Sequence, residues 1–170
     1  MKKFLLIGNM NAITYKSIFP LIKDNKMWLG TFYGSMEFII SADKFDETKC
    51  SKYRVENGEY YIKLMMITWY TNMEHNKRNE PLILTKKYDP ALYPKYDNYD
   101  AINVNKVSDI PMDYDGVIGV PITFLGKYCP TQFEIIGEAN HGKDSEWDLF
   151  TPSVGGKTIF KRILIKRISK

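Results

Sequence analysis

Two asparagines follow the first apolar segment of the chain closely enough to act together. Residues 4–7 are continuously apolar, and Asn9 and Asn11 come directly after Gly8. In α/β folds, ligands bind at the carboxyl ends of parallel strands, so both amides are candidate ligand-binding groups. Capping of the loop that they begin is the alternative role for both side chains.

A second candidate group combines aromatic, amide and cationic side chains. Trp69, Tyr70 and Asn72 end a long β-like segment, and Lys77 and Arg78 lie in the polar loop that follows it. Rings stack on bases, amides hydrogen-bond to their edges and cations contact phosphates. This combination predicts DNA contact, whereas a core tryptophan beside a solvated loop is the alternative.

Positive and negative charges separate along the second half of the chain. Residues 157–170 contain six lysines and arginines and no acid, whereas residues 89–115 contain six aspartates against two lysines. The terminal cations are therefore the natural phosphate contacts, and the acidic stretch would repel phosphate. The four that we expect to bind DNA are Lys161, Arg162, Lys166 and Arg167. The alternative is that these cations only keep one face of a terminal strand soluble.

Several common catalytic and metal-binding patterns do not occur in the sequence. It has no glycine-rich phosphate loop, no Gly-x-Ser-x-Gly turn and no His-Glu-x-x-His motif. Two cysteines and two histidines are too widely spaced for a metal site, and the aspartates of residues 109–115 resemble a calcium loop only loosely. From these residues alone we predict no metal ligand and no catalytic residue.

The elements that must position these groups begin as an α/β unit. We expect a strand over residues 3–7, a helix from residue 14 or 15 to residue 25 and a strand over residues 27–30. Further strands are expected at residues 38–40, 60–71, 81–84, 116–120 and 133–136, with a break at residues 137–140, a turn at residues 57–58 and an irregular loop over residues 88–101. The tail fits either a basic amphipathic helix or a terminal strand, and its isoleucine content favours the strand.

Length and composition are those of one globular domain. The chain has 170 residues, 44% of them hydrophobic, and a net charge of +4. No apolar segment approaches the length of a membrane span, and the first one is shorter than the apolar core of an export signal. We therefore expect a cytoplasmic protein without a membrane partner.

Several long sequence strings together resemble one enzyme family. These strings are GNMNAITYK (8–16), WYTN (69–72), YPKYDNYDAINV (93–104), IPMDYDGVIGVPITFL (110–125) and QFEIIG (132–137). In this order they resemble the EcoRI-type adenine-specific DNA modification methylases, with a likeness that extends from residue 2 to about residue 168.

The resemblance implies methyl transfer from S-adenosylmethionine to the exocyclic amine of adenine in double-stranded DNA, within a restriction-modification or phage system. It implies a Rossmann-like core and a target base flipped out of the duplex. Asn9 and Asn11 then become candidate cofactor contacts. Lys95, Tyr96 and Asn98 lie in one of the matching strings and become candidate DNA contacts, although packing of the fold is an equal alternative for them.

The sequence also departs from the family pattern. It contains no Pro-Pro pair, which the catalytic motif of such enzymes requires, and no cofactor glycine loop. The chain therefore resembles the carboxyl-terminal half of a methylase, with residues 1–30 ending the Rossmann-like core and residues 31–170 forming a β-rich region for core completion and DNA recognition. We expect the chain alone to be inactive and an upstream methylase half to be its partner. A non-catalytic DNA-binding or assembly module, or a gene remnant, would be the alternatives.

Overall fold

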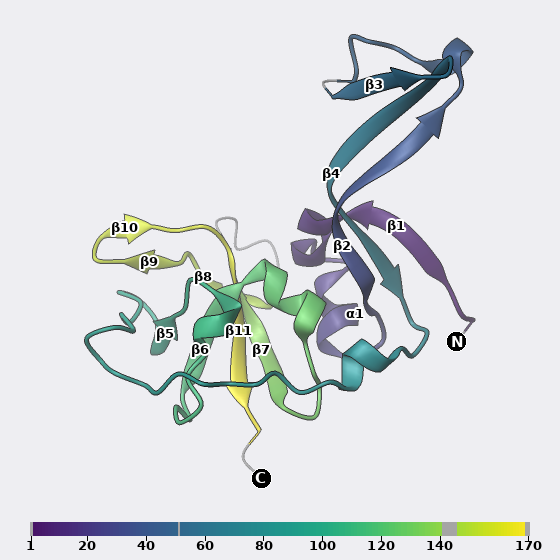
Figure 1. Ribbon diagram of the computed structural model, residues 1–170. Coiled ribbons are helices and arrows are strands. Elements are labelled where there is room, and N and C mark those ends of the chain that lie inside the picture. Colours follow the sequence, from purple (N-terminus) through teal and green to yellow (C-terminus); the bar gives the residue numbers. More distant parts are fainter. Residues whose placement is uncertain (1, 51, 141–145, 169–170) are drawn as a thin grey trace.

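The fold consists of two β-sheets joined by short helices, with a long arm rising from one of the sheets (Figure 1). The computed structural model describes residues 2–50, 52–140 and 146–168. Within these ranges strands greatly outnumber helices, so the expected mixture of α and β structure is present but strongly β-rich. None of the described helices is both long enough and apolar enough to cross a membrane.

The first sheet differs from the expected parallel arrangement. Strands β1 (Leu5–Asn9) and β2 (Trp28–Ile40) both pair antiparallel with β4 (Glu59–Thr71), which lies between them. The first two strands therefore point the same way without being neighbours. The strand–helix–strand unit of a parallel sheet that the sequence predicts is therefore present only in part, because the returning strand β4 occupies the position between β1 and β2.

The connection between β1 and β2 is less helical than expected. A 3₁₀ helix, η1 (Met10–Thr14), is followed by α1 (Phe19–Lys23), which contributes Phe19 and Ile22 to the core. Pro20 occupies the first turn of α1, where a missing backbone N–H is tolerated. The helix expected from residue 14 or 15 to residue 25 is thus reduced to five residues.

The far halves of β2 and β4 form an arm that projects from the rest of the molecule (Figure 1). Here β2 joins two segments that the sequence suggested were separate strands, and β3 (Tyr53–Glu56) adds a third strand. The short helix η2 (Ala42–Lys44) lies between β2 and β3. Asn57 and Gly58 have positive φ values between β3 and β4, so the expected turn is confirmed.

The second sheet has the order β5-β6-β11-β7-β8 within the described residues. Its strands are β5 (Ala101–Asn103), β6 (Val117–Pro121), β7 (Phe133–Ala139), β8 (Asp148–Phe150) and β11 (Arg162–Arg167), and β9 (Ser153–Val154) and β10 (Lys157–Thr158) form a separate hairpin. The tail is therefore a strand, as favoured. It is also central, since β11 pairs with both β6 and β7.

Two details of the second half differ from expectation. Residues 81–84 belong to no strand, and the Gln132 side chain instead holds Leu82 through both its backbone N–H and its carbonyl, at 2.7 and 2.8 Å. Strand β7 continues through Gly137 to Ala139, where a break was expected. Short 3₁₀ helices connect the remaining elements: η3 (Asn76–Asn79), η4 (Val107–Asp109) and η5 (Ile122–Lys127).

One hydrophobic core joins the two sheets. It contains Leu29 and Tyr70 from the first sheet, Phe19 from α1, and Ile118 and Ile163 from the second sheet. The buried residues of this core come from outside the arm. The base of the first sheet is therefore packed against the second sheet, while the arm stands apart from both.

Candidate functional site

The carboxyl end of β1 is fixed by hydrogen bonds around Asn9. The Asn9 side chain accepts a hydrogen bond from the Asn11 backbone N–H at 2.8 Å, which caps η1. The Asn9 carbonyl accepts a hydrogen bond from the Tyr70 hydroxyl at 2.8 Å. Asn9 therefore has the capping role that was the alternative to ligand binding, and its amide oxygen is already engaged.

Asn11 and Thr14, both in η1, place an amide oxygen and a hydroxyl near the carboxyl end of β1. The Asn11 Oδ1 atom is buried and has no hydrogen-bond partner among the described residues. Thr14 donates to the Asn11 carbonyl at 3.1 Å and accepts from the Lys161 ammonium at 2.8 Å. Lys161 thus reaches from the start of β11 to η1, and the Asn11 oxygen can accept a hydrogen bond from a ligand amine or hydroxyl.

Tyr70 is strongly affected by its surroundings. Its ring is buried beneath η1 in the core, and burial raises the pKa of its hydroxyl to about 12, with a smaller contribution from Tyr15. The hydroxyl therefore remains a hydrogen-bond donor at any physiological pH. Tyr70 holds the end of β1 through this hydroxyl, and its expected contact with DNA stays a prediction.

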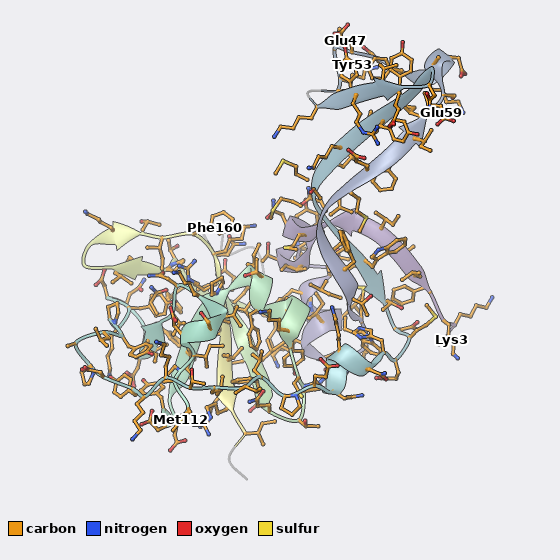
Figure 2. All side chains as sticks on the ribbon, in the orientation of Figure 1. Lys3, Glu47, Tyr53, Glu59, Met112 and Phe160 are labelled. Atoms are coloured by element: carbon orange, nitrogen blue, oxygen red, sulfur yellow. The ribbon has the colours of Figure 1, made fainter. Side chains whose placement is uncertain are left out.

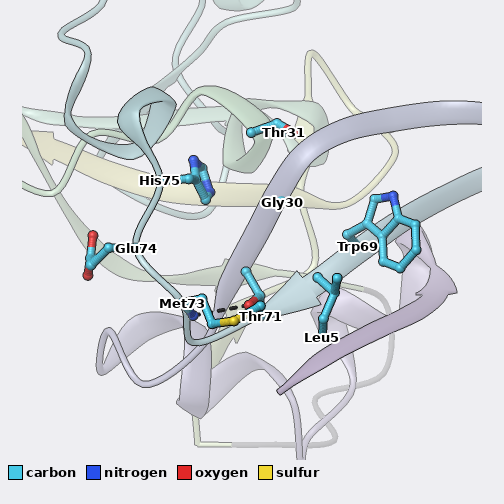
Figure 3. A pocket seen from close by; sticks show the side chains of 8 residues that line it. All are labelled: Leu5, Gly30, Thr31, Trp69, Thr71, Met73, Glu74 and His75. Carbon is cyan, nitrogen blue, oxygen red and sulfur yellow. Dashed lines mark hydrogen bonds between the residues drawn. The ribbon is translucent and has the colours of Figure 1, made fainter. Parts of the chain in front are cut away.

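Trp69 lies on the opposite face of the sheet from Tyr70 and lines a cavity of about 250 Å³ (Figure 3). The other lining residues are Leu5, Gly30, Thr31, Thr71, Met73, Glu74 and His75. A β-carbon at residue 30 would meet the Trp69 β-carbon at 2.7 Å, so the close packing there requires glycine. Since Leu5 and Thr71 lie at the amino end of β1, the cavity is at the opposite end of that strand from Asn11.

The polar residues expected beside Trp69 mostly hold the fold. Asn72 accepts from the Phe4 N–H at 2.9 Å and donates to the Lys2 carbonyl at 2.8 Å, so it extends the edge of β1. Arg78 is buried, stacks on the Trp28 ring at 3.6 Å and donates to Asn25. Burial lowers its pKa. Lys77 is exposed and donates to the Thr31 carbonyl.

The tyrosine-rich string of residues 93–104 has mainly a packing role. Tyr96 is buried, and its hydroxyl donates to Asn103 Oδ1 at 3.1 Å. Burial raises its pKa. Asn98 donates to the Thr151 carbonyl, and Lys95 pairs with Asp100 at 2.8 Å, which raises the pKa of Lys95. Of the three expected DNA contacts in this string, only Lys95 presents an exposed charge.

The basic tail is divided between buried and exposed cations. Arg162 is only 9% exposed, and its guanidinium donates to the side-chain oxygens of Asn103 and Asn105 and to the Phe160 and Lys161 carbonyls. Its guanidinium is engaged within the fold, and the expectation that it binds DNA stays a prediction. Arg167 donates to the Met112 carbonyl, and Lys166 is exposed.

Three residues that the sequence patterns do not single out have a notable position in the structure. Asn103 and Asn105 hold the Arg162 guanidinium, and Phe160 is an exposed aromatic residue just before β11. Asn103 lies in the tyrosine-rich string of residues 93–104, but nothing in the spacing of that string pairs an asparagine with an arginine 59 positions later. Among the described residues, no cluster of histidine, cysteine and acidic side chains could hold a metal ion.

Comparison with known proteins gives a consistent answer over nearly the whole chain. The family model described as adenine-specific methyltransferase EcoRI matches residues 1–167. The chain is 49% identical, over 97% of its length, to the type II methyltransferase M.EcoRI of Escherichia coli. The chain belongs to this family.

Two mycoplasma proteins extend the comparison. The chain is 41% identical to M.MgeORF184P of Mycoplasma genitalium and 38% identical to M.MpnI of Mycoplasma pneumoniae, each over 79% of its length. Both are named type II methyltransferases. The chain covers 50% of the E. coli relative and 44% of each mycoplasma relative, so it spans about half the length of the curated relatives it matches. No solved structure matches the chain.

Proposed function

We propose that this chain is one half of a DNA adenine-N6 methyltransferase of a restriction-modification or phage system. In this proposal it completes the sheet of a Rossmann-like core and contributes to DNA binding. A second polypeptide segment, corresponding to the half of the relatives that the chain does not span, contributes the catalytic motif and most of the cofactor site. The identity to M.EcoRI over nearly the whole chain carries the proposal.

The exposed surface of β1 supports the need for a second half. Leu5, Leu6 and Ile7 are 50%, 57% and 46% exposed, although successive side chains point to opposite faces of the sheet. Among the described strands β1 pairs only with β4, which leaves its other edge open. An open edge with apolar residues on both faces is suited to a further strand and its covering helices.

The strand arrangement is compatible with the edge of a Rossmann-like sheet. Strands β1 and β2 run in the same direction and are connected by α1, while β4 returns between them. Addition of a further strand to the open edge of β1 would make β1 an interior strand of the sheet. The carboxyl end of β1, with Asn11, would then lie where α/β folds bind ligands.

Asn11 fits a role in binding S-adenosylmethionine, whereas Asn9 fits it less well. The Asn11 Oδ1 atom is a buried acceptor without a described partner, and the cofactor carries amine and hydroxyl donors. The Asn9 oxygen is already used to cap η1. When bound, the cofactor supplies the methyl group, and in this proposal Asn11 orients one of its donor groups.

DNA binding in this proposal depends on exposed cations. Lys77, Lys95 and Lys166 remain candidate phosphate contacts because their side chains lie at the surface. Lys161 and Arg167 are weaker candidates because both are less exposed and each has a partner in the fold. Such contacts strengthen binding without setting sequence preference.

Co-expression with the unspanned half of M.EcoRI tests the proposal in cells. We expect N6-methyladenine to appear at sequence sites that the host does not modify, only when both halves are present. Leu6→Glu places a charge on the exposed strand β1 and should abolish the new methylation, whereas Leu92→Glu, at a distant exposed leucine, should not. DNA binding without methylation by the joined halves would favour the non-catalytic module instead.

A further inference from the structure

Phe160 is an exposed aromatic residue on a firmly held stretch of backbone. Its side chain is 57% exposed, and it lies in the connection between β10 and β11. Figure 2 shows Phe160 at the surface of the molecule, on the side from which the arm rises. Single exposed apolar side chains are common at protein surfaces, and this one is distinguished by the backbone that carries it and by its neighbours.

The backbone on both sides of Phe160 is fixed by hydrogen bonds. The Ile159 N–H donates to the Pro152 carbonyl at 2.9 Å. The Phe160 carbonyl accepts from the buried Arg162 guanidinium at 2.8 Å. An exposed ring on an immobilised backbone loses little conformational entropy when it binds a partner, which is the arrangement expected of a contact residue.

The surroundings of Phe160 indicate the chemistry of that partner. The next residue, Lys161, reaches Thr14 with its ammonium group at 2.8 Å. Tyr15, next to Thr14 in sequence, is 56% exposed, so the Lys161–Thr14 hydrogen bond brings together two segments that each carry an exposed aromatic residue. No carboxylate among the described residues lies within ion-pair distance of Lys161. Exposed aromatic residues together with a cation that has no carboxylate partner are typical of surfaces on which nucleic-acid bases stack.

The position of these residues relates them to the proposed site. Tyr15 and Thr14 follow Asn11 at the carboxyl end of β1, and Lys161 joins that end to β11. We propose that Phe160 stacks on an unpaired base of the bound DNA, with Tyr15 and Lys161 beside it. This inference rests on the proposed function, because it assumes that DNA is the partner.

Two DNA duplexes that differ by one unpaired adenine test the inference with the full chain. We expect the chain to bind the duplex with the unpaired adenine more tightly than the fully paired duplex. Phe160→Ala should weaken binding to the former by about 5- to 150-fold, the usual effect of losing one stacked base, and should change binding to the latter by less than about twofold. Phe160→Trp should retain the preference, and its emission should be quenched only by the duplex with the unpaired adenine.

Leu92→Ala is the matched control, because Leu92 is 73% exposed on a loop outside the proposed site. It should leave both affinities unchanged, and the thermal midpoint of Phe160→Ala should match that of the parent chain. If Phe160→Ala binds each duplex with the same affinity as the parent chain does, this inference is overturned while the proposed function stays intact. A parent chain that binds neither duplex would overturn both this inference and the DNA-binding part of the proposed function.

Discussion

Replacement of Arg162 by methionine should destabilise the fold, although the sequence alone suggested a surface role for this arginine. Its guanidinium is buried and donates to Asn103, Asn105 and two backbone carbonyls. Hydrogen bonds from a charged donor contribute about 1.5–3 kcal/mol each. Burial of the charge costs several kcal/mol and offsets most of that sum. The expected net loss is about 2–4 kcal/mol in the free energy of unfolding.

Urea and thermal denaturation followed by circular dichroism measure this loss. For a chain of this size, about 2–4 kcal/mol corresponds to a fall of roughly 4–16 °C in the midpoint. Lys166→Met, at an exposed position of the same strand, is the matched control and should change stability by less than about 0.5 kcal/mol. Arg162→Lys keeps the charge but loses the planar fork, so it should be destabilised at least as much as Arg162→Met.

Two outcomes would refute this reasoning. If Arg162→Met unfolds with the same free energy as the parent chain, the hydrogen bonds of the guanidinium make no net contribution. If Arg162→Lys is fully stable, positive charge at this position matters and the geometry of the hydrogen bonds does not.

Three further predictions concern pH, salt and the arm. Burial raises the pKa of Tyr70 from 10 to about 12, so the contribution of this hydroxyl to stability is complete below pH 10 and is lost as the pH rises through 12. Between pH 9 and pH 11.5 the parent chain should therefore lose more unfolding free energy than Tyr70→Phe, and equal losses would contradict this prediction. Lys157→Gln and Lys166→Gln, at exposed lysines, should each flatten the slope of log affinity for DNA against log salt by about 0.9; an unchanged slope places these lysines away from DNA. Replacing residues 37–63 by Asn-Gly removes the arm and joins the paired residues Met36 and Leu64. Because the arm contributes no residue to the described core, the shortened chain should still melt cooperatively, and loss of cooperative melting would show that the arm supports the fold.

Local sequence patterns predicted much of the fold. The β-like composition of residues 60–71 predicts β4, and the Asn57–Gly58 pair predicts the turn before it. The isoleucines of residues 163–165 favour the strand β11. The pairing of distant strands could not be predicted in the same way. That β4 inserts between β1 and β2 depends on contacts about 60 residues apart in sequence, which a local pattern does not encode.

The candidate site depends on burial as well as on residue type. Residue type indicates what a side chain can do, but burial decides whether it is available. The sequence predicts Arg162 and Arg78 as phosphate contacts, and in the structure both are buried and hydrogen-bonded within the fold. Asn11 was predicted as a ligand-binding group, and its unpartnered oxygen keeps that prediction open.

The most direct test of the central claim is a titration of methyl transfer with purified components. The unspanned half of M.EcoRI is held at fixed concentration with duplex DNA and labelled S-adenosylmethionine, and this chain is added stepwise. We predict no transfer by either half alone, and a rate that rises with added chain and saturates at one equivalent. Transfer by this chain alone, or a stable complex of the two halves that methylates no adenine, would contradict the claim.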